Sequence, residues 1–131
     1  MLASLRIVFG CLLAVAAAGL LAVVTAEPML FPSLGPTIIM LVDSPGRRAT
    51  APRSIVLAHG AGLITGWLSL AIFGLLGAPS ALATGVDWPR AGAAALSVAG
   101  TAALNRALRA PHPPAAATTL IVSLGFFANA D

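Results

Sequence analysis

The decisive stretch of this chain reads Pro111-His112-Pro113-Pro114-Ala115-Ala116-Ala117-Thr118-Thr119, and a related stretch upstream reads Phe31-Pro32-Ser33-Leu34-Gly35-Pro36-Thr37-Ile38-Ile39. Aligned without gaps, Pro32 falls on Pro113 and Thr37 falls on Thr118, and an aliphatic run follows in both copies. Because proline fits the first turn of a helix but not its interior, each stretch predicts a proline-broken start of a short apolar helix. A duplicated broken helix inside a membrane protein typically marks a substrate site.

The composition places the chain in a membrane. Hydrophobic residues make up 59% of the 131 residues and charged residues only 8%, and the mean hydropathy is +0.99. An ordinary globular domain carries roughly 25% charged residues. A full crossing needs about 20 residues, so there is room for about four or five spans and for no appended soluble domain. We therefore expect residues 1–131 to form one transmembrane domain with an all-α integral membrane fold, a compact helical bundle.

Charge and cysteine content exclude several classes of function. The seven basic residues are all arginine, against four acids, which suits anchoring at a membrane surface. Nucleic-acid binding needs a basic face with interleaved aromatic residues, so we expect no nucleic-acid partner. The lone Cys11 gives no framework for disulfides, zinc or thiol chemistry. We expect no metal, no cofactor and no enzymatic activity.

Residues 7–24 form an uninterrupted apolar stretch and predict the first transmembrane helix. A cleaved signal peptide is the alternative, because Val24-Thr25-Ala26 is a weak small-residue cleavage pattern. We favour a retained helix, since a stripe of small residues suited to helix packing runs along this segment at Gly10, Ala14, Ala18 and Ala22.

Two further full helices are expected, over residues 54–77 and 88–108, with a loop over residues 79–87. The first carries His59, Gly62 and Gly66 on one face. The second has an alanine stripe expected to pack against a neighbour, at Ala91, Ala95, Ala99 and Ala103. It also has a polar stripe that either lines a polar path or makes interhelical hydrogen bonds, at Ser97, Thr101 and Asn105.

The arginines predict the topology. If the N-terminus is cytoplasmic and residues 28–42 cross the membrane, the positive-inside rule is obeyed by Arg6, Arg47, Arg48, Arg53, Arg106 and Arg109. Only Arg90 then lies outside, beside Asp87. We expect a multi-pass protein of the cell inner membrane with a cytoplasmic N-terminus. Its two units, about residues 1–80 and about residues 86–131, form an inverted-topology repeat, and the second lacks its last helix because the sequence stops at Asp131.

In this topology the two short helices start toward each other near mid-membrane. A helix start leaves unpaired N–H groups and a charge of roughly +0.5, in a medium where unsatisfied polar groups are costly. A small anion would satisfy both starts. Gly35 would allow close backbone approach, and Thr37 and Thr118 supply hydroxyl donors. The alternative is a pair of proline-kinked helix starts whose caps satisfy only the backbone.

The two histidines are candidates for proton relay. His112 lies directly at the second break and His59 lies in the second full helix, and a histidine titrates near neutral pH. A buried, hydrogen-bonded residue is the alternative for His59. Two histidines without neighbouring Cys, Asp or Glu make a poor metal set, and no Cys-x-x-Cys-His haem motif is present.

These two stretches, together with the stretch from Ala51-Pro52-Arg53 to His59, resemble the HPP family of small integral membrane proteins over nearly the whole chain. The resemblance implies a helical membrane architecture, occurrence in bacteria and plastid membranes, and an association with nitrite transport. Family members usually continue past the second short helix into another hydrophobic helix. By motif match the resemblance implicates in the site Ser33, Leu34, Gly35, Pro36, Thr37, His59, His112, Pro113, Pro114, Ala115 and Thr118.

The sequence therefore predicts a transporter or channel for a small monovalent anion, with nitrite as the first candidate, held between the two opposed helix starts. Proton coupling and passive flow both stay open. The alternatives are a non-transporting membrane scaffold or assembly subunit, and a haem-binding subunit that uses His59 and His112. The expected partners are the lipid bilayer, a small inorganic anion and further copies of the chain, since small-residue stripes favour a homo-oligomer.

Overall fold

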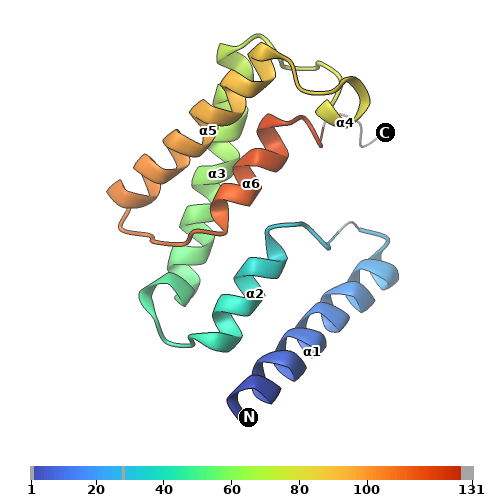
Figure 1. Ribbon diagram of the computed structural model, residues 1–131, viewed down its shortest axis with the longest axis vertical. Coiled ribbons are helices and arrows are strands. Elements are labelled where there is room, and N and C mark those ends of the chain that lie inside the picture. The colour runs from blue at the N-terminus through green and yellow to red at the C-terminus, as the bar shows by residue number, and fades with distance from the viewer. Residues whose placement is uncertain (1, 28, 128–131) are drawn as a thin grey trace.

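The computed structural model describes residues 2–27 and 29–127 (Figure 1). This part of the chain is helical and contains no strand, as the all-α prediction requires. Residue 28 and residues 128–131, where the expected missing helix would begin, lie outside the described residues. The elements are α1 (Leu2–Thr25), α2 (Leu34–Asp43), the 3₁₀ helix η1 (Arg48–Thr50), α3 (Pro52–Ile72), α4 (Ala81–Thr84), α5 (Trp88–Ala107) and α6 (Ala115–Ser123).

Two described helices are long and apolar enough to cross a membrane, over Ser4–Thr25 and Pro52–Ile72. A signal sequence or a buried core helix can meet the same two criteria, so length and apolarity alone do not assign the chain to a membrane. Helix α5 has 20 residues, whereas α2 has 10 and α6 has 9. Since a full crossing needs about 20 residues, α2 and α6 each reach about halfway. Within the described residues, two helices meet the criteria for a span, fewer than the four or five spans that were expected.

Local sequence sets most helix boundaries. Pro52 occupies the first turn of α3, and the Asp87 carboxylate accepts the backbone N–H of Arg90 at 2.8 Å to cap α5. The prediction of one helix over residues 54–77 is wrong at its end, because α3 stops at Ile72 and Gly74 adopts a φ of +67°. The single turn α4 lies within the stretch expected to be a loop.

Helices α3, α5 and α6 pack on one another, while α1 packs on α2 (Figure 1). Glycines allow the close approach of α3 and α6: a Cβ at Gly62 would lie 2.9 Å from the Ala115 carbonyl oxygen, and one at Gly66 would lie 2.7 Å from the Val122 Cβ. The small-residue face predicted for α3 is thus the face that α6 covers. On α1, a Cβ at Gly10 would lie 2.7 Å from a Val42 methyl carbon, so the predicted stripe faces α2.

Helix α5 packs with its polar stripe. The Thr101 hydroxyl lies 2.6 Å from that of Thr65 on α3, and the Thr119 hydroxyl of α6 lies 3.2 Å from the same Thr65 oxygen. Interhelical hydrogen bonding, one of the two alternatives for this stripe, is therefore observed at Thr101. The alanine stripe makes no packing face within the described chain, because its members are exposed: Ala91, Ala95, Ala99 and Ala103.

The interior is rich in polar side chains, and large apolar side chains lie on the surface. The largest fully buried side chains are His112, Thr119, Ser97 and Ser123. Large hydrophobic side chains of α1 are exposed instead, including Val23 at 80%. This distribution reverses that of a water-soluble domain, and it suits helices that meet lipid on the outside and hydrogen-bond to each other inside.

A buried arginine fixes the far end of α6. Arg90 is 3% exposed, and its guanidinium donates to the carbonyl oxygens of Pro79 at 2.7 Å and Ser123 at 3.3 Å. Ser123 ends α6, where the helix dipole is negative, so the cation stabilises this terminus.

Candidate functional site

The two short helices have the same local structure at their starts. They begin at Leu34 and Ala115, which are aligned positions of the two related stretches. The preceding residues also match in backbone conformation, with φ −71° and ψ −16° at Ser33 and φ −56° and ψ −19° at Pro114. In Figure 1, α2 and α6 run in opposite directions with their starts facing each other.

Four polar side chains meet between these helix starts and form what we call the histidine–threonine cluster: Thr37, His59, His112 and Thr118. The Thr118 hydroxyl lies 2.6 Å from His59 Nδ1. The Thr37 hydroxyl lies 3.1 Å from His112 Nε2 and 3.4 Å from His59 Nε2. The two imidazole rings touch edge to face, with centroids 5.0 Å apart and planes inclined at 63°.

The partners of each atom assign the direction of the hydrogen bonds. His112 Nδ1 lies 2.7 Å from the carbonyl oxygen of Ala49, which can only accept, so Nδ1 carries a proton. In a neutral His112, Nε2 then accepts from the Thr37 hydroxyl. The Thr37 oxygen can accept from His59 Nε2–H, and His59 Nδ1 can accept from Thr118. The cluster thus forms a continuous chain of donors and acceptors.

Thr37 also has a competing partner. Its hydroxyl lies 2.9 Å from the carbonyl oxygen of Ser33. A hydroxyl has one proton to donate, so when Thr37 donates to Ser33 its bond with His112 requires a proton on His112 Nε2. His112 is then an imidazolium. The distances are therefore compatible with two hydrogen-bonding patterns, which differ by one proton on His112 and by the rotation of the Thr37 hydroxyl.

The backbone amides at the start of α6 do not match the prediction. The N–H groups of Ala115, Ala116 and Ala117 donate to the carbonyls of the three preceding residues at 3.0 to 3.1 Å, which closes a 3₁₀ first turn. The unpaired amides expected to face an anion are therefore already bonded here. Polar side chains, rather than these amides, are the groups directed between the helix starts.

The structure brings together Thr37, His59, His112 and Thr118 from the predicted set. Ser33 adds its carbonyl, and Ala115 packs against Gly62. A Cβ at Gly35 would meet nothing within 4 Å, so no protein atom requires a glycine there. The remaining predicted residues lie at the two helix starts and have no polar side-chain atom: Leu34 and Pro36 in the first turn of α2, and Pro113 and Pro114 just before α6.

Two residues that take part in these hydrogen bonds were not predicted from the sequence. Ala49 acts through its carbonyl oxygen, which no side-chain pattern reveals. Thr65 joins α5 and α6 through one hydroxyl, and its signal was weak because it lies on an otherwise apolar helix.

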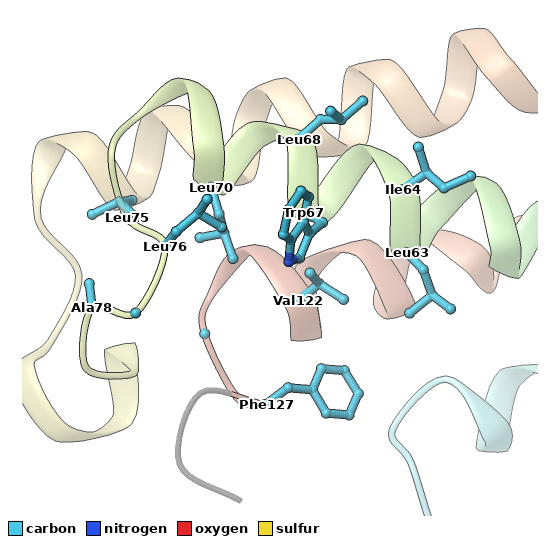
Figure 2. Close-up of a pocket in the computed structure, with 12 residues that line it drawn as sticks. Leu63, Ile64, Trp67, Leu68, Leu70, Leu75, Leu76, Ala78, Val122 and Phe127 are labelled. Atoms are coloured by element: carbon cyan, nitrogen blue, oxygen red, sulfur yellow. The ribbon is translucent and has the colours of Figure 1, made fainter.

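Two cavities flank the cluster's helices. One of about 640 Å³ reaches His112 and is also lined by Arg48, Arg106 and Arg109. The other, of about 590 Å³, is apolar: Figure 2 shows Leu63 and Trp67 of α3 with Val122 of α6 and Phe127 around it. Of these two cavities, the first offers the chemistry for a charged ligand.

The cluster is a poor site for a metal or haem. Within the residues described, no three of His, Cys, Asp and Glu gather. A haem held by both histidines would need its macrocycle between the rings, whereas the rings of His59 and His112 are in edge contact and both bond to Thr37. The geometry disfavours the haem-binding alternative.

A family model described as "HPP, transmembrane region" matches residues 1–128 of the chain. Comparison with curated proteins and comparison with solved structures give no match.

Proposed function

The chain belongs to the HPP family of transmembrane proteins, and from this membership we propose that it carries a small monovalent anion across a bacterial inner membrane, with nitrite as the first candidate. The observation that carries the proposal is the histidine–threonine cluster. It gathers two hydroxyls and two imidazoles between two helix starts.

The cluster suits an anion because it offers donors without opposing negative charge. Of the three described acids, Glu27 is exposed, the Asp43 carboxylate accepts from Ser44, and Asp87 caps α5, and none of them bonds to the cluster. The hydroxyls of Thr37 and Thr118 and a protonated ring nitrogen can all donate to a bound oxyanion. The dipoles of α2 and α6 point their positive ends toward the cluster, while the first amides of α6 are themselves hydrogen-bonded, so the side chains supply the direct donors.

The inverted repeat is part of this proposal. The opposite directions of α2 and α6 and their matching starts support it, with units of about residues 1–80 and 86–131. We place the N-terminus in the cytoplasm, since the arginines then favour that side. The α5 alanine stripe, exposed within one chain, is where we expect a second copy to pack.

Coupling to protons follows from the two hydrogen-bonding patterns of the cluster. A proton on His112 Nε2 accompanies the turn of the Thr37 hydroxyl toward Ser33. A protonated cluster and a bound monovalent anion are together neutral, which lowers the cost of the anion in the low dielectric of the membrane. We therefore propose that anion and proton move together.

Flux measurements in proteoliposomes test the proposal. The purified protein should carry nitrite faster than nitrate, formate or chloride, and an inward proton gradient should accelerate uptake. Thr118→Val and Thr37→Val each remove one donor, which we expect to weaken apparent affinity by about 5- to 30-fold, or roughly 1–2 kcal/mol. Thr25→Val is the matched control, because its exposed hydroxyl bonds only to the carbonyl four residues earlier.

Thr119 is the neighbour of Thr118 on α6, but it cannot serve as the control for Thr118→Val, since its own buried hydroxyl bonds to Thr65. If both cluster variants carried nitrite like the unmodified protein, or if no anion moved at all, the cluster would be a packing device and the scaffold alternative would replace transport.

A further inference from the structure

The 640 Å³ cavity that reaches His112 has no role in the site described so far. It is bordered by η1, the C-terminal half of α5, the segment after α5 and the first turn of α6. Its wall contains Thr101 and Asn105, and its rim holds Arg48, Arg106 and Arg109. His112 itself is 1% exposed. This cavity therefore brings an open, arginine-lined space up to one member of the cluster.

The three rim arginines carry uncompensated charge. Within the described residues no ion pair is formed, and the only guanidinium with hydrogen bonds is that of Arg90, at the other end of α5. Arginines at the rim of a cavity with low-dielectric walls focus positive potential into it and raise the local concentration of anions. The cavity is thus electrostatically prepared for a negative ligand.

Asn105 is a second, independent indication of a polar ligand. Its Oδ1 is a buried side-chain oxygen without a hydrogen-bond partner in the described part of the chain. Buried polar atoms are nearly always bonded, and Asn105 lines the cavity, so rotation of its side chain would let the amide pair with a polar ligand that enters there. The oxygen and nitrogen of an amide exchange places by rotation, so the same side chain can turn N–H groups toward an anion.

Arg109 is held in an unfavourable backbone conformation. Its φ is +52°, in the left-handed region at the end of α5, where glycine is the usual residue. The chain nevertheless places an arginine there, with its side chain at the cavity. Strain of this kind is expected where the side chain has a function.

The geometry points to an anion vestibule: Arg48, Arg106, Arg109 and Asn105 collect the small inorganic anion from the arginine-rich side and pass it toward His112. This inference rests on the proposed transport function and adds to it a recruitment site on one side. It makes the protein asymmetric, because the apolar cavity beside Trp67 offers no such charge.

The test is nitrite flux in vesicles of phosphatidylcholine with the protein in one orientation. A variant with Arg106→Gln and Arg109→Gly should raise the half-saturating nitrite concentration from the arginine-rich side about tenfold, as expected for lost charge-assisted hydrogen bonds. The maximal rate should stay unchanged, because the cluster is intact. Flux from the opposite side should keep its half-saturating concentration.

Two features protect this test from folding artefacts. Arg109→Gly removes the left-handed strain, so it should raise rather than lower the unfolding temperature. Arg53→Gln is the matched control: Arg53 is exposed at the start of α3 near the same end but does not line the cavity. It should leave the half-saturating concentration unchanged.

The outcomes separate the two proposals. If the unmodified protein carries nitrite and the arginine variant has the same half-saturating concentration, the vestibule is refuted and transport stands. If the unmodified protein carries none above empty liposomes, both fall. If the variant differs only in vesicles that contain phosphatidylglycerol, the cavity holds an anionic lipid headgroup, and the vestibule is refuted.

Discussion

Replacing Gly62 by alanine tests how closely α3 and α6 must approach to form the histidine–threonine cluster. The new Cβ would lie 2.9 Å from the Ala115 carbonyl oxygen, whereas ordinary contacts begin at 3.4 Å, so the backbone of α6 must move by about 0.5 Å. Thr118 lies on the same turn, so its 2.6 Å bond to His59 Nδ1 would lengthen.

The magnitude follows from two opposing effects. Overpacking at such a contact costs about 1–3 kcal/mol, while alanine in a helix interior gains about 1 kcal/mol over glycine. Gly60 lies on the same helix, and a Cβ there would meet nothing within 4 Å. Gly60→Ala should therefore show the gain alone, and the two variants should differ by about 1–3 kcal/mol in unfolding free energy.

The assay is denaturant unfolding in detergent micelles, followed by circular dichroism of the helices, with nitrite flux measured on the same preparations. Gly62→Ala should be the less stable variant and should lose flux, whereas Gly60→Ala should keep both. Equal unfolding free energies for the two variants would refute the close approach of α3 and α6 at Gly62.

Three further predictions concern other parts of the structure. Arg90→Met should lower the unfolding free energy by about 2–4 kcal/mol, because two buried carbonyls lose their donor. The control Arg53→Met at the surface should change it by less than about 0.5 kcal/mol. Thermal unfolding followed by tryptophan fluorescence compares the two variants. Alanine in place of the Pro113–Pro114 pair should abolish nitrite flux without preventing membrane insertion, since the turn that starts α6 loses its fixed φ; flux with unchanged kinetics would count against this. An impermeant thiol reagent added to intact cells should label a cysteine placed at Asp87 but not one placed at Arg109. Labelling of both positions would overturn the topology.

The two threonines of the cluster could be predicted from the sequence, because proline restricts the backbone only at its own position and at its neighbours. The fixed φ of proline and its missing N–H place a helix start wherever the sequence puts it, so the related stretches yielded two short helices with equivalent Thr37 and Thr118. Composition likewise indicated a membrane environment, which the match to a transmembrane family region supports, because burial in lipid depends on total apolarity rather than on which residues touch.

The choice of packing face on α5 could not be read from the sequence. Alanine and polar stripes both repeat at helical spacing, and each is suited to close packing in a membrane. The structure buries the polar stripe, because Thr101 finds the Thr65 hydroxyl on α3 at 2.6 Å. The sequence pattern does not specify the partner of a hydroxyl, so this decision belongs to the tertiary fold.

The sequence by itself determined that the chain is a helical membrane protein and where its two short helices begin, because apolarity and proline act within a few residues. Tertiary structure alone decided that Thr37 would meet His112, 75 residues away, and that the Ala49 carbonyl would fix the proton of that imidazole. Hydrogen bonds between distant segments depend on how whole helices pack, and a backbone carbonyl leaves no trace in the identity of its residue.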